Sequence, residues 1–447
     1  MESGSVGRQS KKQYVISITI IGVFFFIFGF VTWLNGILIP YLKIACELTD
    51  FQALFVAFAF YISYTVMALP SSWVLKKTGF KNGMMVGLWV MAIGSLVFIP
   101  AAYSRIYGVF LTGLFIMGTG LAILQTASNP YITIIGPRET AARRISIMGI
   151  CNKVAGAIAP LVLAYFIFEE GDEFLKSLEG LGEQARNLAL DGLAERVIGP
   201  YLVMAVVLFL LGLLIRFAPL PEIESEQEES EEETGNQGKS NIFQFPWLIL
   251  GALALFFYVG VEVIAGDTII RYGLSIGVPI ESAKYYTSLV LVAMVVGYIL
   301  GILLIPKVIS QRSLLALSAL SGIVFTLIAI FTPPSSMAQF SFIDLMTLKK
   351  VELQLPYSIL FVALLGLSNA IVWPAIWPLA IHNLGKFIKT GSALLIMAIA
   401  GGAILPLVWG YISDIAGTQQ AYWVAIPSYL FILYYSLAGY RVKKWKP

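Results

Sequence analysis

Two acidic side chains fall inside apolar segments of this sequence. Glu262 and Asp267 are the only two of its 26 Asp and Glu residues that lie in a stretch long and apolar enough to cross a bilayer. A charge at bilayer depth costs about 2.5–3.5 kcal/mol even on lenient insertion scales, so such a residue persists where it has a function or a partner. The two carboxyl groups are therefore candidates for binding and coupling a cation.

Lys153 is the only lysine inside an apolar segment, about eight residues from the nearer end. Its ammonium group cannot easily reach the membrane interface from that depth. It therefore needs a buried partner, for which Glu262 is the natural candidate, or a water-filled cavity. Two alternatives stay open: the pair can be purely structural, and Asp267 can be neutralised by Arg271, four residues later on the same helix.

Uncharged polar and aromatic side chains gather on the apolar segments as well. Gln125 and Asn129 are four residues apart, so they would share one helix face. Amides donate and accept hydrogen bonds and a flat ring can cover C–H groups, so these types together predict a pocket for a hydroxyl-rich sugar. Each can equally be a helix–helix hydrogen bond or a packing ring. The candidate substrate-binding residues are Asn35, Gln125, Asn129, Asn152, Asn369, Trp373 and Trp377.

The composition indicates which elements must position these groups. The 447 residues are 58% hydrophobic and 12% charged, whereas soluble domains carry about 25% charged residues. A spanning helix needs roughly 20 mostly apolar residues, so we expect an all-α membrane protein with twelve transmembrane helices. The twelve stretches are 15–41, 52–75, 83–103, 107–135, 145–168, 199–218, 246–271, 284–306, 313–333, 356–381, 390–413 and 421–440.

The basic residues predict the orientation of these helices. Nineteen of the 29 Lys and Arg residues fall on the side that holds both chain ends, and nine fall on the other side. Cytoplasmic connections are the ones enriched in Lys and Arg, so we expect both termini in the cytoplasm. The net charge of +3 reflects this bias and indicates no nucleic-acid partner. On the outer side, the leucine spacing of connection 169–198 predicts a surface helix.

The chain also divides into two related halves. Residues 155–165 and 401–411 are identical at seven of eleven positions, at an offset of 246. At an offset of 231, Gly29 aligns with Gly260 and Gly36 aligns with Asp267. We expect two pseudo-symmetric six-helix bundles, 1–218 and 245–447, joined by an acidic cytoplasmic linker at 219–244. Many secondary transporters are built from such repeats, with the substrate between the halves near mid-membrane.

Three motifs resemble the fucose permease branch of the major facilitator superfamily: FGFVTWLNGILIP at 28–40, QTASNP at 125–130, and Leu384-Gly385 with Gly391-Ser392. The resemblance implies the major facilitator fold, alternating access and a small sugar carried with a coupling cation. The fucose–proton symporters carry carboxylates where this chain has Gly36 and Gln125. In both respects the sequence is more similar to the glucose/galactose members of the branch.

We therefore expect a secondary active sugar transporter of a bacterial inner membrane that takes up a hexose or an amino-hexose by cation-coupled symport. A uniporter of the same fold and a membrane sugar sensor are the alternatives. Glu262, Asp267 and Lys153 are the candidate coupling residues, and H⁺ and Na⁺ are the candidate cations. No metal cluster, phosphate-binding loop or nucleophile–base set is evident, so we expect neither an enzyme nor a bound cofactor. The expected partners are the sugar and the lipid bilayer, with the protein a monomer.

Overall fold

The computed structural model describes residues 11–134, 141–168, 171–178, 180–218, 241–305, 308–343, 350–384 and 387–445. Most of these residues are helical. The expected acidic linker, 219–244, lies outside the described residues except for 241–244, where the short helix η3 (Ile242–Gln244) begins the second half. The boundaries expected for the two halves stay a prediction.

The first half consists of long apolar helices and three shorter helices in their connections. These are α1 (Lys11–Trp33), α2 (Asn35–Ala45), α3 (Asp50–Ala53), α4 (Phe55–Ser104), α5 (Tyr107–Ile134), α6 (Ala141–Ile167), α7 (Gly171–Ser177), α8 (Glu183–Glu195) and α9 (Ile198–Phe217). α4 covers two expected spans, 52–75 and 83–103. The chain turns between them at Gly79, whose φ of 74° is one that residues with a side chain rarely adopt.

The second half repeats this organisation and adds a β-hairpin. Its elements are α10 (Pro246–Asp267), α11 (Ile269–Ser275), α12 (Ile280–Ala283), α13 (Tyr286–Leu304), α14 (Gln311–Phe331), β1 (Met337–Ile343), β2 (Lys350–Pro356), α15 (Tyr357–Asn369), α16 (Val372–Ile381), α17 (Ile388–Met397), η5 (Ala398–Ala400), α18 (Gly401–Ala416), η6 (Gln420–Val424), α19 (Ala425–Leu437) and η7 (Gly439–Arg441).

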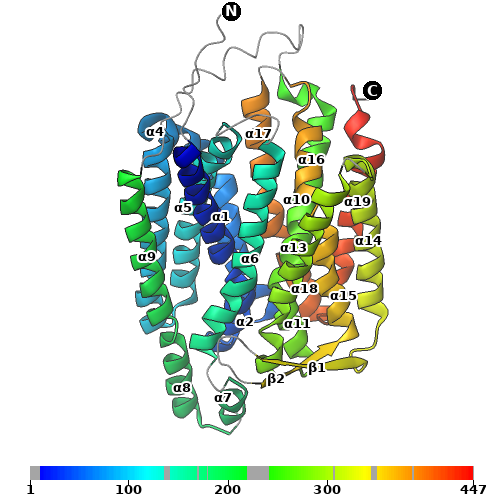
Figure 1. Ribbon diagram of the computed structural model, residues 1–447. Helices are drawn as coiled ribbons and strands as arrows, with labels where there is room; N and C mark the ends of the chain where they lie inside the picture. The colour runs from blue at the N-terminus through cyan, green and yellow to red at the C-terminus, as the bar shows by residue number, and fades with distance from the viewer. Residues whose placement is uncertain are drawn as a thin grey trace, which may run out of the picture.

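The number of spans agrees with the twelve expected from the sequence. Ten helical stretches of the described chain are long and apolar enough to cross a membrane, and one of them, 50–104, covers two expected spans. The twelfth expected span, 421–440, contains η6 and α19 and is not among these ten. The fold is thus the expected twelve-helix arrangement of two six-helix bundles, which lie side by side in Figure 1.

Close helix packing holds each bundle together. A Cβ atom at Gly29 of α1 would overlap the backbone of Asn152 on α6, and one at Gly260 of α10 would overlap Leu405 on α18. Gly29 and Gly260 are repeat mates, and each lies where the first helix of its half approaches the fifth. A side chain at position 29 would push two backbones apart, and one at position 260 would displace the Leu405 side chain.

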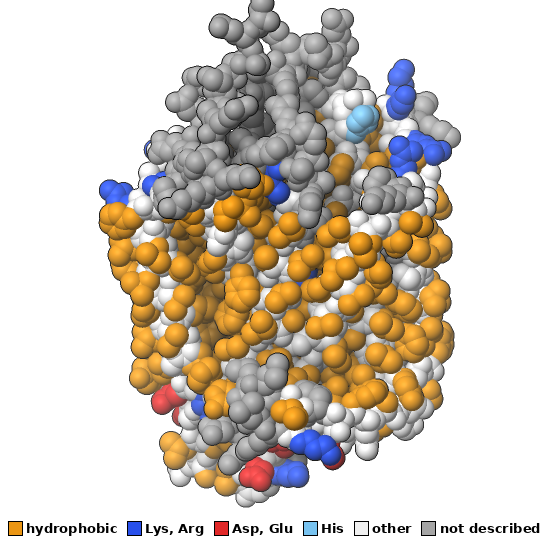
Figure 2. Space-filling view, in the orientation of Figure 1, with side chains coloured by type: hydrophobic (Ala, Val, Ile, Leu, Met, Phe, Trp, Pro, Cys, Tyr) orange, Lys and Arg blue, Asp and Glu red, His pale blue; other side chains and the backbone are white. Residues whose placement is uncertain are grey.

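The outer surface of the bundles is apolar where lipid would contact it. Figure 2 shows hydrophobic side chains across the middle of the visible face, with charged side chains gathered towards its two ends. α9 illustrates the pattern, because Val203 and Leu214 expose 64% of their surface although both are apolar. In water such exposure would be unfavourable, and in a bilayer it is expected.

Two connections differ from their sequence-based predictions. Both lie at the end of the molecule opposite the start of α1. Residues 337–343 and 350–356 form two antiparallel strands, in which Met337 pairs with Pro356. Connection 169–198 forms two helices, α7 and α8, where the leucine spacing predicted a single one. β1, β2, α7 and α8 lie together at this end (Figure 1), which we call the hairpin end.

Helix breaks fall beside three of the candidate polar residues. Asn35 begins α2 directly after the break at Leu34, Asp267 ends α10 before the break at Thr268, and Asn369 ends α15. Expected spans 15–41, 246–271 and 356–381 are therefore each made of two helices in sequence. Discontinuous helices place backbone ends and polar groups at mid-membrane sites in many transporters.

Candidate functional site

The buried ion pair expected from the sequence is present. Lys153 Nζ of α6 lies 2.7 Å from Glu262 Oε1 of α10, and each side chain is 10% exposed. The two residues belong to different halves, so the pair ties the bundles together between α6 and α10. Removing one partner would leave an uncompensated charge in a dry environment. Its role in coupling stays a prediction.

Trp33, which the sequence did not single out, lies against this pair. The Lys153 ammonium group lies 4.7 Å from the centre of the indole ring, within the range of a cation–π interaction. A Cβ at Gly156 of α6 or at Gly266 of α10 would overlap the same ring. The indole of α1 is therefore fitted between two glycines, one from each half.

Asp267 lies five residues beyond Glu262 on α10 and is completely buried. Neither of its carboxyl oxygens has a hydrogen-bond partner within the described residues. The alternative in which Arg271 neutralises it is wrong in this structure, since the Arg271 guanidinium binds Asp50. A buried polar group without a partner is costly, and the role of Asp267 in coupling stays a prediction.

The halves also meet beside Asp267 at Gly36, its repeat mate. A Cβ at Gly36 would lie 2.6 Å from Thr287 Oγ1 and 3.2 Å from the backbone oxygen of Gly266. Thr287 Oγ1 donates a 2.7 Å hydrogen bond to that same oxygen. A side chain at position 36 would therefore overlap Thr287 in this arrangement. The acid of this region is Asp267, which belongs to the second half.

The amides of the first half have different surroundings. Asn35 is 1% exposed, and both polar atoms of its side chain lack a partner in the described chain. Asn152 Nδ2 donates to the backbone oxygen of Phe25 at 3.3 Å, which favours its helix-packing interpretation. Gln125 Nε2 donates to Tyr64 Oη at 3.3 Å. The side chain of Asn129, on α5, lies outside the described residues.

The candidates of the second half contact aromatic side chains of their own half. Trp373 and Trp377 stack, with ring centres 5.4 Å apart and an interplanar angle of 25°. The Trp373 ring lies 6.3 Å from Tyr258, one turn before Glu262 on α10. Asn369 Oδ1 accepts a 2.9 Å hydrogen bond from Tyr429 Oη. The stacked rings thereby lie next to α10 at Tyr258, four residues before Glu262.

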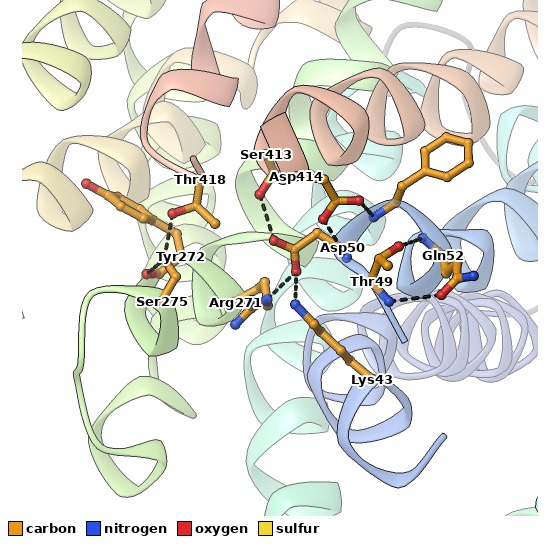
Figure 3. Close-up of polar contacts among 11 residues, drawn as sticks. Lys43, Thr49, Asp50, Gln52, Arg271, Tyr272, Ser275, Ser413, Asp414 and Thr418 are labelled. Atoms are coloured by element: carbon orange, nitrogen blue, oxygen red, sulfur yellow. Dashed lines mark hydrogen bonds and ion pairs between the residues drawn. The ribbon is translucent and has the colours of Figure 1, made fainter. Parts of the chain in front are cut away.

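A second polar cluster between the halves was missed by the sequence reasoning. Asp50 of α3 forms ion pairs with Lys43 of α2 and with Arg271 of α11, and its Oδ2 accepts a 2.8 Å hydrogen bond from Ser413 Oγ of α18. Figure 3 shows these groups converging on the Asp50 carboxylate at the hairpin end. Asp50 lies just outside the apolar stretches, so it does not stand out as a charge at membrane depth.

A signal for this cluster does exist in the sequence. Asp50 and Glu281 align at the offset of 231 and follow the first span of each half. An acid at the same place in both repeats, next to basic residues at Lys43 and Arg271, indicates a charged contact. The sequence alone could not show which acid pairs with which base, because that depends on how the halves face each other.

The comparisons with known proteins agree with this architecture. A family model described as Major Facilitator Superfamily matches residues 21–400. A glucose/galactose transporter of Brucella abortus is 32% identical over 434 residues, which cover 96% of this chain and 95% of that protein. An L-fucose-proton symporter of Escherichia coli is 29% identical over 96% of this chain and 94% of that protein.

Among solved structures, a crystal structure of the Escherichia coli fucose:proton symporter is 26% identical, with a TM-score of 0.68, and the match covers 97% of this chain and 100% of that one. The family match, the relatives and the twelve-helix architecture lead to one assignment. The chain belongs to the Major Facilitator Superfamily, in the branch that includes these glucose/galactose transporters and fucose symporters.

Proposed function

We propose that this protein is a secondary active transporter that takes up a hexose or an amino-hexose together with a cation, by alternating access. The observation that carries the proposal is the buried Lys153–Glu262 pair, 2.7 Å long, between the two halves. An ion pair in this position must break or rearrange whenever the halves separate around it. A ligand that compensates either charge would lower the cost of that separation.

The surroundings of the pair suit a sugar. The indole of Trp33 borders it in one half, and in the other half the stacked Trp373 and Trp377 lie next to Tyr258, one turn from Glu262. Asn35 offers two unpartnered polar atoms, and Asn369 offers an unpartnered Nδ2, within the described part of the chain. Buried donors and acceptors of this kind gain hydrogen bonds when a hydroxyl-rich ligand enters.

Asp267 is the proposed coupling carboxyl. Its two oxygens are buried and unpartnered among the residues described, so an ionised form is costly in this state. Binding of H⁺ or Na⁺ removes that cost. Movement of the halves past Gly36 and Thr287 would then control access of the cation to the carboxyl group.

The proposed setting is a bacterial inner membrane, with a monomer as the working unit. The hairpin end faces outward in this proposal, because the connections at the opposite end hold most of the Lys and Arg residues. Both termini are then cytoplasmic.

Uptake into proteoliposomes tests the function directly. Radiolabelled glucose, galactose and glucosamine are offered to the purified protein, with sodium and proton gradients imposed separately. Accumulation against a gradient is expected with one cation and should disappear when an ionophore collapses that gradient. Equilibration without accumulation would make the protein a uniporter, and sugar binding without uptake would make it a sensor.

Substitution of the two acids tests the coupling assignment. Asp267→Asn and Glu262→Gln should each abolish accumulation, because each removes a carboxylate at membrane depth, while sugar exchange at equal concentrations persists in at least one of them. The exchange assay serves as the control for folding and sugar binding. If both variants concentrate sugar as the parent does, the carboxyl groups have no coupling role.

A further inference from the structure

Two carboxylates at the hairpin end bind backbone N–H groups of the opposite half. Asp172 belongs to α7 of the first half, and Asp414 belongs to α18 of the second half. Each reaches a four-residue helix that follows the first span of the other half. These helices are α3, beginning at Asp50, and α12, beginning at Ile280.

The Asp414 contact uses both carboxyl oxygens. Its Oδ1 accepts a hydrogen bond from the backbone N–H of Asp50, and its Oδ2 accepts one from the backbone N–H of Phe51, both at 2.9 Å. These are the first two N–H groups of α3, which have no partner inside the helix. The carboxylate also faces the positive end of the backbone dipoles. Figure 3 shows it directed at this end of the helix.

The Asp172 contact has the same form in the opposite direction. Its Oδ1 accepts a hydrogen bond from the backbone N–H of Ile280 at 2.9 Å, and its Oδ2 accepts one from that of Glu281 at 3.3 Å. These are again the first two N–H groups of a short helix, α12. In both contacts, therefore, one carboxylate from one half satisfies the exposed end of a helix in the other.

The two contacts lie near each other around the Asp50 cluster. A cavity of about 700 Å³ at the hairpin end is lined by residues of both halves, among them Asp172, Lys43 and Arg271. Lys43 and Arg271 bind the Asp50 side chain. The cavity therefore reaches from one contact to the ion pairs beside the other.

We propose that Asp172 and Asp414 form a reciprocal clasp that holds the two halves closed at the hairpin end. Each carboxylate has to leave its helix before the halves can part there. The two contacts cross the same interface in opposite directions, so the loss of one leaves the other to limit the opening. The clasp is a device for the alternating access of the proposed function, but it requires no particular sugar or cation.

Distance measurements between spin labels test the clasp without transport. Cys46 and Cys151 are first replaced by serine, although burial already raises the pKa of the Cys46 thiol to about 11, which disfavours the reactive thiolate. Labels are then attached at Tyr103→Cys in the first half and Phe331→Cys in the second, both exposed helix ends. Pulsed electron resonance in nanodiscs gives the populations of closed and open hairpin ends.

Asp172→Ala and Asp414→Ala should each raise the ratio of open to closed molecules by about fivefold, the effect typical of losing one helix cap. The double variant should raise it by about 25-fold, since the two contacts act on the same opening. Asp172→Asn and Asp414→Asn each keep one acceptor oxygen and should fall between the parent and the alanine variants.

The control is Glu195→Ala, which removes an exposed acid from α8 and should leave the distances unchanged. Thermal unfolding of every variant identifies any that fail to fold, for which the asparagine variants provide the substitute. Unchanged distances in the folded double variant would overturn the clasp. An effect of one single variant equal to that of the double would overturn its reciprocal nature. Because the assay contains no sugar, a failure of sugar uptake does not affect its outcome.

Discussion

Two sets of ion pairs tie the halves of this transporter together, and they differ in how much water reaches them. The Lys153 and Glu262 side chains are each 10% exposed and form one pair in the interior. At the hairpin end, Asp50 is 7% exposed, but its partners Lys43 and Arg271 are 20% and 22% exposed. The interior contact joins one ammonium group to one carboxylate, whereas the hairpin-end contact shares one carboxylate among several donors.

This difference determines what happens when a partner is removed. A charge left alone in the interior has little access to water, and neither residue has a second ion-pair partner within the described part of the chain. A cation at the hairpin end can turn towards water, where exposed ion pairs contribute little. The interior pair should therefore dominate stability, while the hairpin-end cluster can open and close at lower cost.

The largest effect is expected from breaking the interior pair. Lys153→Ala should lower the free energy of unfolding by about 3–5 kcal/mol, because Glu262 is left as a buried unpaired acid. The Lys153→Ala/Glu262→Ala double variant should be more stable than that single variant. Thermal unfolding of the purified proteins measures all members of the cycle. Simple addition of the two single effects would show that the residues do not interact.

An intermediate effect is expected at the hairpin end. Asp50→Asn should cost about 1–3 kcal/mol, since it removes a charged acceptor while Lys43 and Arg271 can still be hydrated. A double-mutant cycle with Arg271→Gln should give a coupling energy smaller than that of Lys153 with Glu262. A larger value would reverse the comparison between the two regions.

The smallest effect is expected for an ion pair inside one half. Arg186 of α8 and Glu47 lie 2.9 Å apart, and their side chains are 44% and 46% exposed. Arg186→Gln should therefore change the free energy of unfolding by less than about 1 kcal/mol. Unfolding measured at low and high salt provides the check. A loss comparable with that of Asp50→Asn would mean that exposure does not govern these pairs.

The sequence predicts the helices better than it predicts their contacts. Hydrophobic length locates the spans because each helix must satisfy its own backbone in lipid. The same rule makes Lys153 and Glu262 conspicuous, since a charge at that depth needs a partner. The rule does not apply to Asp50, which lies at the end of a span where a charge costs little, so the only signal for it is its alignment with Glu281 in the other repeat.

Other parts of the site depend on geometry that residue types do not encode. The sequence suggests that Arg271 could neutralise Asp267 at a helical spacing, but the helix breaks at Thr268 and Arg271 binds Asp50. Likewise, nothing in the local sequence indicates that Trp33 fits between glycines of both halves. These contacts arise from the way in which the two bundles face each other.

The clasp at the hairpin end also bears on the origin of the two halves. A contact that runs from each half to the other in the same form is the pattern of an isologous dimer interface. Yet at the offset of 246, Asp414 aligns with Phe168, and Asp172 aligns with Thr418. The two acids are therefore not copies of one ancestral residue. A duplication that produced the repeat can account for the capped helices, α3 and α12, but the acids that cap them require separate substitutions in each half.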